Sequence, residues 1–341
     1  MSSIKWYGLS LILLCIHLIF QPFSVYSSLE RRLLTTDLEI SFQDLLDQSF
    51  QDSLENLLND QMLGREWWMK VNTLKESLLG RQIFDKVMVS KYGLHELWLE
   101  DSDQLIRNLG FIKAFEEKFN SVVALVPHSG SLLEDSWHES SLLFSKDGYP
   151  QIREWLLLHD QTESFFYQGD HHLNHFATPV IASYVLEQLG LSINTPSLKY
   201  CGEFSGTLTP YHLTFKPSLD SLWVYDNPIK ELKLGNETYS SLHDLNACGG
   251  DNAYQGLLHG NHGWSEITTV TENEQSILVI KDSHAHQFIP FLTPHYSKID
   301  VVDLRHYNGS IEALVDQYDD VLVLVGEGSV RDDRNFFKLS R

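Results

Sequence analysis

Three short apolar runs in the last third of the chain constrain its fold most strongly. They are SILVIKDS (276–283), KIDVVDL (298–304) and DDVLVLVG (319–326), and a helical pattern over 311–318 separates the last two. Nearly continuous runs of Val, Ile and Leu are typical of strands buried on both faces of a sheet. Strands that alternate with helices predict an α/β fold with a mostly parallel sheet and flanking helices.

The same alternation begins earlier in the chain. Strand-like runs KVMVSKYG (86–93) and SVVALVP (121–127) alternate with helical stretches at 103–119 and 179–189. No repeat and no low-complexity tract interrupts this pattern. We therefore expect one large α/β domain.

The chain is expected to have three parts. Residues 1–27 form a signal peptide or membrane anchor, 28–79 a helical lead-in with apolar residues at helical spacing, and 80–341 the α/β domain. Four tryptophans with apolar neighbours are expected in the core, although exposed ones could stack on sugar rings. They are Trp67, Trp68, Trp98 and Trp155.

The N-terminus predicts that the protein leaves the cytosol. Lys5 is followed by the apolar run LSLILLCIHLIF (9–20) and a more polar stretch, the order of the three regions of a signal peptide. Cleavage after Ser27 is expected, with an uncleaved anchor as the alternative. The body keeps Cys201 and Cys248, which in an exported protein favour a disulfide over two buried thiols.

The charge of the chain limits its partners. With 46 acidic and 25 basic residues, the formal net charge is −21. Nucleic acids and anionic membranes attract clustered Lys and Arg, so they are poor partners for this chain. A neutral or carbohydrate ligand is expected instead. No glycine-rich phosphate loop is present, and no organic cofactor is expected.

Polar residues follow two of the predicted strands and include the three types of a serine triad. Asp170 and His172 follow the predicted strand 164–168, and Ser283 follows the strand 277–280. A serine becomes nucleophilic when an imidazole takes its proton and a carboxylate orients that imidazole. Backbone N–H groups at Ser283 and in the next helix would then face a developing oxyanion. Alternatively, Ser283 only caps that helix.

Several segments carry a resemblance to a known family. GDHHLNHFATPVIASYVLEQLG (169–190) and ILVIKDSHAHQFIPFLTPHYSKIDVVDLRHYNGS (277–310) resemble the DHHW protein family, and FSGTL (204–208) extends the match. That family is similar to SGNH-like acetyltransferases that modify bacterial exopolysaccharides such as alginate. The resemblance implies an SGNH-hydrolase-like fold in which Asp170, His172 and Ser283 match the catalytic aspartate, histidine and nucleophile.

The chain departs from the family pattern at two positions. Leu173 replaces the tryptophan that follows Asp-His-His, which alters packing or a substrate platform. His286 replaces the asparagine after Lys-Asp-Ser-x-Ala, and its imidazole N–H can still donate a hydrogen bond to an oxyanion.

Other residues near these motifs are candidates for substrate or oxyanion contacts. Asp282 either supports the site by a hydrogen bond or completes the turn after the strand. Arg305 could bind a carboxylate-bearing sugar, but an ion pair with a nearby acid is favoured. Gly206 either lines the site or permits a close backbone approach. His171 is expected at the surface or behind the site, and His128 is a further pocket candidate.

The histidines also allow a metal site. They are His171, His172, His175, His284 and His286. A metal hydrolase usually adds carboxylate ligands, and the two nearby carboxylates both have another role available. The metal-dependent hydrolase is therefore the third hypothesis.

The first hypothesis is an exported serine-dependent O-acyl esterase or O-acetyltransferase that acts on a polysaccharide outside the cytosol. An acetyl donor would have to reach it there, which suggests a membrane partner that passes acyl groups across. The second hypothesis is a non-catalytic cell-envelope protein that keeps the fold and binds glycan.

Overall fold

The computed structural model describes residues 23–37, 49–97, 103–132, 149, 151–158, 165–214, 219–248 and 253–341. The predicted leader lies mostly outside these residues, as does Trp98. The chain divides into two compact units, Met1–Phe84 with Pro210–Pro217, and Asp85–Thr209 with Ser218–Arg341. None of the helices within the described ranges has the length and apolar character needed to span a membrane.

The first unit contains two helices and short strands. Their bounds are α2 Ser49–Asp60, α3 Arg65–Leu78, β1 Tyr26–Ser27, β2 Arg32–Leu33 and β3 Ile83–Phe84, and β1 pairs antiparallel with β2. The side chain of Asp60 joins α2 to this hairpin, because it accepts hydrogen bonds from the guanidinium of Arg32 and the N–H of Thr35. The Arg32 hydrogen bond lowers the pKa of Asp60 to about 2.

Two of the predicted core tryptophans lie at the surface of this unit. Trp67 and Trp68 on α3 each expose 52% of their surface, and their rings meet edge to face with centroids 4.8 Å apart. The prediction that they are buried is wrong, since α3 has no buried residue. Trp155 in the second unit is partly buried and donates its indole N–H to the carbonyl of Val180.

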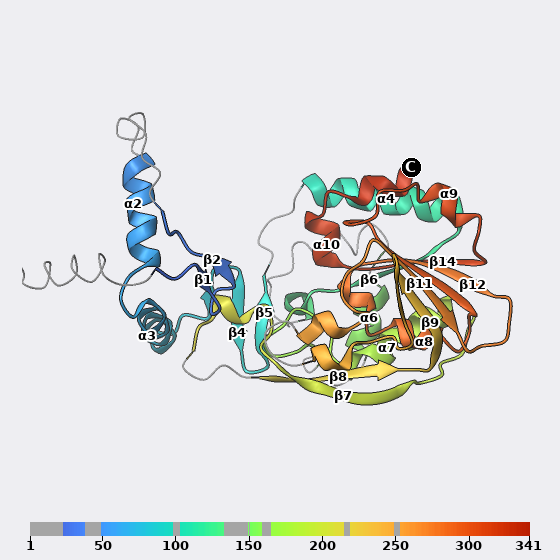
Figure 1. Cartoon of the computed structure of the whole chain (residues 1–341), viewed down its shortest axis with the longest axis horizontal. Coiled ribbons are helices and arrows are strands. Elements are labelled where there is room, and N and C mark those ends of the chain that lie inside the picture. Colours follow the sequence, from blue (N-terminus) through green and yellow to red (C-terminus); the bar gives the residue numbers. More distant parts are fainter. Residues whose placement is uncertain are drawn as a thin grey trace, which may run out of the picture. The chain divides into compact units, whose positions relative to one another are not determined.

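The second unit is built on a seven-stranded sheet in the order β10-β9-β11-β13-β12-β14-β6 (Figure 1). The strands are β6 Val122–Val126, β9 Ile229–Leu234, β10 Glu237–Tyr239, β11 Trp264–Thr269, β12 Ser276–Lys281, β13 Lys298–Asp303 and β14 Asp320–Gly326. The three apolar runs of the C-terminal third thus form adjacent central strands. Val279 of β12 lies between Val301 of β13 and Leu322 of β14.

The prediction of a mostly parallel sheet is wrong. The pairs β13–β12, β12–β14 and β14–β6 are parallel, whereas β10–β9, β9–β11 and β11–β13 are antiparallel. The parallel strands are those with continuous apolar sequences. In the antiparallel strand β11, buried and exposed residues alternate, because one face of this part of the sheet is in contact with water.

Helices cover both faces of this sheet (Figure 1). They are α4 Asp103–Phe119, α6 Gln151–Leu157, α7 Ala177–Gln188, α8 Ile289–Leu292, α9 Glu312–Val315 and α10 Glu327–Asp332. Helices α4 and α10 pack on one face, where Leu278 and Ile280 of β12 point. Helices α6, α7 and α8 pack on the other, with Ile277 and Val279. The predicted helix at 103–119 is confirmed by α4.

Smaller hairpins flank the sheet. β4 Val87–Ser90 pairs with β5 Gly93–Glu96, and β7 Ser197–Phe204 pairs with β8 Asp220–Asp226. The structure joins Cys201 of β7 to Cys248 in a disulfide, with Cα atoms 5.2 Å apart.

The strand predicted at 164–168 is absent from the described residues of that segment. Only an isolated antiparallel bridge is found there, between Phe166 and Leu173. Asp170 and His172 therefore lie in a loop and not at the end of a sheet strand. Leu173 is 7% exposed and belongs to the core under the sheet, so its replacement of tryptophan is a packing change.

Candidate active site

Ser283 lies at the carboxyl end of the parallel part of the sheet. Strand β12 ends at Lys281, and Ser283–Ala285 form a short 3₁₀ turn that Asp282 caps by accepting the N–H of His284. Ligands of α/β proteins gather at this edge because the chain turns away from buried strands there. The side chain of Ser283 is half-buried and borders two cavities.

The loop that carries Asp170 and His172 brings both side chains to Ser283. Nδ1 of His172 lies 2.5 Å from Oδ1 of Asp170, and Nε2 of His172 lies 2.8 Å from Oγ of Ser283. Asp170 and His172 are only 1% and 5% exposed, so water competes little for these contacts. The three residues whose spacing suggested a triad are thus in consecutive hydrogen-bond contact.

A second loop fixes the Asp170 carboxylate. Thr207 donates both its N–H and its hydroxyl to Oδ2 of Asp170, at 2.8 and 2.9 Å. The loop can come this close because Gly206 lies against the backbone of Gly169, where a Cβ atom would overlap the carbonyl group. The expectation of a close backbone approach at Gly206 is met in the structure. Thr207 lies in the FSGTL segment (204–208), which was a candidate to line the site, but its contact with Asp170 was not predicted.

The electrostatics of this pair fix the proton positions. Burial opposes the ionisation of Asp170, but the charge and hydrogen bond of His172 outweigh it and hold the pKa of Asp170 well below its usual value. An ionised carboxylate only accepts, so Nδ1 of His172 carries the proton. Nε2 then has a lone pair for the Ser283 hydroxyl, which is the protonation state of a general base.

Backbone N–H groups after Ser283 are already used. The N–H of His284 donates to Oδ1 of Asp282, and the N–H of Ala285 donates to the carbonyl of Asp282. The expectation that the groups opening the next helix face an oxyanion is therefore wrong for these two. The turn after β12 is so tight that both N–H groups point back to Asp282, whose carboxylate and carbonyl accept them.

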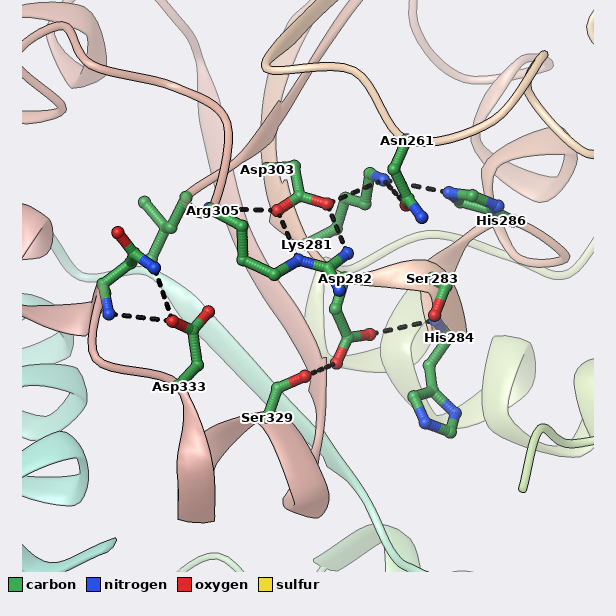
Figure 2. A network of polar contacts seen from close by, with 12 residues as sticks. Asn261, Lys281, Asp282, Ser283, His284, His286, Asp303, Arg305, Ser329 and Asp333 are labelled. Carbon is green, nitrogen blue, oxygen red and sulfur yellow. Dashed lines mark hydrogen bonds and ion pairs between the residues drawn. The ribbon is translucent and has the colours of Figure 1, made fainter. Parts of the chain in front are cut away.

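Lys281 is buried next to the site and makes three hydrogen bonds (Figure 2). Its ammonium donates to Oδ1 of Asn261 at 3.0 Å, to Nε2 of His286 at 2.9 Å, and to Oδ2 of Asp303 at 3.4 Å. Burial lowers the pKa of Lys281, while the charge of Asp303 opposes that shift. Lys281 and Asn261 were both missed as site residues.

The contact with Lys281 fixes the tautomer of His286. An ammonium can only donate, so Nε2 of His286 accepts and its proton resides on Nδ1. Burial and the charge of Lys281 keep the pKa of His286 well below its usual value, so this imidazole is neutral. Nδ1 of His286 is buried and has no hydrogen-bond partner among the residues that the structure describes.

Asp282 and Arg305 have structural partners (Figure 2). Besides capping the turn, Asp282 accepts the N–H of Gly326 at 2.8 Å and the hydroxyl of Ser329 at 2.6 Å, so it ties β12 to α10. The turn-completing role of Asp282 is therefore confirmed, and its other two hydrogen bonds go to Gly326 and Ser329. Arg305 forms a bidentate pair with Asp303, Nε to Oδ1 at 2.9 Å and Nη2 to Oδ2 at 2.6 Å, which is the favoured interpretation of this residue.

Two cavities border Ser283. A cavity of about 140 Å³ is lined by the triad and by Phe204, Thr207, Tyr254, Gln255, Gly260, Asn261 and His286. A larger, more polar pocket of about 440 Å³ contains His128, His171, Asp282, His284, Arg305 and Glu327 in its lining. Tyr254 lies flat against His172, with ring centroids 3.9 Å apart, and so limits how that imidazole can turn.

Three of the five candidate metal-binding histidines lie together. One nitrogen each of His171, His172 and His284 lies within 4.8 Å of the others, whereas His175 and His286 are outside this group. Burial lowers the pKa of His171 to about 3 and that of His284 to about 4, so both are neutral near pH 7.

Comparison with known proteins supports the fold. No protein-family model and no curated protein sequence matches the chain. Among solved structures, a DHHW family protein from Eubacterium siraeum matches with a TM-score of 0.59 and 16% identity, over 74% of this chain and 94% of that one. Bacillus cereus PatB1 matches with a TM-score of 0.57 and 15% identity, over 72% and 97% of the two chains, and its structure with a sulfonyl adduct gives 0.58.

At these identities the similarity concerns the fold, and it covers nearly the whole length of both neighbours. The resemblance noted in the sequence segments 169–190 and 277–310 therefore extends to three dimensions. The chain is similar in fold to a DHHW family protein and to PatB1.

Proposed function

We propose that the protein is an exported serine-dependent O-acyl esterase or O-acetyltransferase that acts on a polysaccharide. The observation that carries the proposal is the 2.8 Å contact between Nε2 of His172 and Oγ of Ser283. The other nitrogen of this imidazole contacts the buried carboxylate of Asp170. A half-buried serine in contact with a carboxylate-oriented imidazole is the requirement for acyl transfer through a covalent intermediate.

The reaction has two halves. Ser283 Oγ attacks the carbonyl carbon of the acyl donor, while Nε2 of His172 takes the hydroxyl proton. The tetrahedral intermediate collapses, the proton passes to the leaving oxygen, and an acyl-serine forms. His172 then takes a proton from water or a sugar hydroxyl, whose oxygen attacks the acyl-serine. Collapse releases the product, and His172 returns the proton to Ser283.

His286 is the proposed donor to the oxyanion. Its Nδ1–H is buried and unpartnered among the described residues, and the ring lines the 140 Å³ cavity together with Ser283. A preorganised donor of this kind, already stripped of water, stabilises negative charge without reorganisation. Lys281 acts through His286 by keeping the proton on Nδ1, so it is a positioning residue.

The two cavities suggest separate places for the acyl group and the sugar. The smaller one has the aromatic walls of Phe204 and Tyr254 and suits a short acyl chain. The larger one offers Arg305, His128 and carboxylates, and hydrogen-bonding groups of this kind suit a glycan. Because Ser283 borders both, an acyl group on its oxygen would lie between donor and acceptor. A membrane protein that supplies the acyl group belongs to the same proposal.

Export is supported by the disulfide between Cys201 and Cys248, since such bonds persist outside the cytosol.

PatB1, which has a similar fold, exists with a sulfonyl adduct, and sulfonyl reagents modify activated hydroxyl groups. If this chain shares that serine chemistry, sulfonyl reagents should modify its Ser283.

The test compares the full chain with Ser283→Ala and His172→Ala on a chromogenic acetyl ester, with Ser310→Ala, an exposed serine elsewhere in the unit, as the control. Loss of about 10³-fold or more in both site variants, with the control unaffected, is expected. A folded parent as inactive as its variants, but able to bind glycan, would favour the non-catalytic alternative. Adding polysaccharide acceptors then separates transfer from hydrolysis.

A further inference from the structure

Three imidazoles meet beside the Ser283 hydroxyl. His171 and His172 are consecutive in the loop, and His284 follows Ser283 directly. The ring centroids are 4.0 Å apart for His171 and His172, 4.9 Å for His172 and His284, and 5.6 Å for His171 and His284. One ring nitrogen of each lies within 4.8 Å of the other two. The proposed acyl-transfer steps use only one of the three.

Hydrogen bonds to the loop fix lone pairs on two of these rings. The hydroxyl of Thr207 donates to Asp170, so Oγ1 can only accept from His171, whose Nδ1 is 2.7 Å away. The proton of His171 is therefore on Nδ1, and its Nε2 has a free lone pair. His172 is held in the same tautomer by Asp170. Two Nε2 lone pairs of neighbouring imidazoles are thereby ready to bind a cation.

The third ring is held in place and has an unused nitrogen. Nδ1 of His284 is buried without a hydrogen-bond partner among the described residues. The ring lies against Gly326, where an added Cβ atom would overlap it. Buried imidazole nitrogens normally have a partner, so this nitrogen has an unused capacity to bind a ligand.

We propose that His171, His172 and His284 form an inhibitory binding site for Zn²⁺. Zinc binds imidazole nitrogen at 2.0–2.1 Å, and three histidines leave a fourth tetrahedral position for water. The nitrogens need to move closer together by about 1.5 Å, since a tetrahedral site separates them by about 3.3 Å. The hydrogen bond that the distal nitrogen Nδ1 of His172 donates to Asp170 is the usual support of a zinc-bound histidine. The all-nitrogen donor set excludes Ca²⁺ and Mg²⁺, which need oxygen ligands.

Zinc at this site would inhibit acyl transfer. The Nε2 lone pair of His172 cannot bind the metal and accept the Ser283 proton at once. This consequence rests on the proposed function, whereas the binding of zinc does not. Inhibition would be reversed by a chelator, because no covalent bond forms.

The experiment measures zinc directly. The purified full chain is stripped of metal, titrated with Zn²⁺ by calorimetry, and its retained metal is counted by mass spectrometry after dialysis. We expect one zinc per chain, and Co²⁺ in its place should give the visible absorption of a tetrahedral site. His284→Ala and the partly exposed His171→Gln should each weaken binding at least tenfold. His175→Ala is the matched control, since it removes a histidine of the same loop that lies outside the cluster.

A second readout separates this proposal from the acyl-transfer proposal. Phenylmethylsulfonyl fluoride is expected to label Ser283, and saturating Zn²⁺ should slow that labelling. Labelling of the wild-type chain without stoichiometric zinc binding would overturn the zinc site and leave the serine mechanism standing. Zinc binding that both histidine variants abolish, without any labelling of Ser283, would support the site and contradict the mechanism. Zinc binding that His284→Ala and His171→Gln leave unchanged would also overturn the proposal.

Discussion

Nε2 of His172 lies 2.8 Å from Oγ of Ser283, although 111 residues separate them in the chain. Ser283 is placed by β12, a central strand buried on both faces, whereas His172 is placed by a loop held against Gly206 and Thr207. Strand β12 thus places Ser283, one loop places His172 and Asp170, and the second loop places Thr207, and these four side chains are linked by consecutive hydrogen bonds.

The charge of Asp170 is expected to be essential, and not only its shape. Asp170→Asn keeps the volume but removes the charge and replaces one of the two accepting oxygens by an NH₂ donor, so His172 is no longer held with its proton on Nδ1. Turnover of an acetyl ester should fall by about 10³–10⁴-fold, with little change in the midpoint of thermal unfolding. A fall of less than tenfold, measured by steady-state kinetics, would show that His172 is oriented by other contacts.

Thr207→Val provides a graded comparison at the same carboxylate. It removes the hydroxyl hydrogen bond but keeps the backbone N–H that also reaches Oδ2 of Asp170. Turnover should therefore fall by only about tenfold, less than in Asp170→Asn. Equal losses in both variants would mean that the Thr207 hydroxyl, and not the charge of Asp170, controls the site.

Lys281→Met tests whether Lys281 positions His286. Without the ammonium donor at Nε2, His286 is free to place its proton on either nitrogen, and we expect a mixture of tautomers in ¹⁵N-detected NMR. Turnover should fall about tenfold to a hundredfold through kcat, and the variant should be less stable by about 1–3 kcal/mol because the buried acceptors on His286 and Asn261 lose their donor, while Asp303 keeps Arg305. An unchanged His286 spectrum with lowered stability would assign Lys281 a purely structural role.

Gly206→Ala tests the contact that places Thr207. The added Cβ would overlap the carbonyl of Gly169, so the loop must move, at a cost of about 2–4 kcal/mol. Gly110→Ala is the control, because Gly110 lies within α4 with open space around its Cβ position. It should be neutral or stabilise by about 0.5–1 kcal/mol. Denaturant unfolding of the two variants should show opposite signs.

Glu327 should make the stability fall as the pH rises. Burial raises the pKa of Glu327 to about 8, so the folded chain holds a proton that the unfolded chain releases above its ordinary pKa of 4.5. Unfolding then releases this proton between pH 4.5 and 8, and this group lowers the stability as pH rises through that range. Glu327→Gln keeps an acceptor for the N–H of His128 and should flatten this dependence. Thermal unfolding from pH 5 to 8 measures how the stability of the wild type and of Glu327→Gln changes with pH. The same pH dependence in both proteins would contradict the prediction.

The sequence predicted the fold where patterns are local and strong. The apolar runs at β12, β13 and β14 could only be buried strands, and their shared edge placed Ser283 correctly. The direction of the outer strands could not be predicted, because β11 pairs with β9 and β13, which lie far from it in the sequence. The tryptophans of α3 show the same limit, since apolar neighbours in sequence do not determine which face of a helix is covered.

The candidate site was predicted by residue type and spacing, but not its supporting contacts. Asp170 and His172 were recognised, although the loop that carries them was expected to end a strand. Thr207 lies in the FSGTL segment, but neither its contact with Asp170 nor that of Asn261 with Lys281 has a local signal, because these contacts arise only when the loops fold. Lys281 stood in the Lys-Asp-Ser motif, yet a lysine at a strand end usually faces solvent, and only its burial shows otherwise.

The most direct test of the central claim is to trap the acyl group. The full chain, mixed rapidly with an activated acetyl ester and quenched in acid, would be digested and its peptides analysed by mass spectrometry. We expect one acetyl group, located on Ser283, that accumulates in the wild type and is absent from Ser283→Ala and His172→Ala. Acetylation of another residue, or turnover that persists in Ser283→Ala, would contradict it.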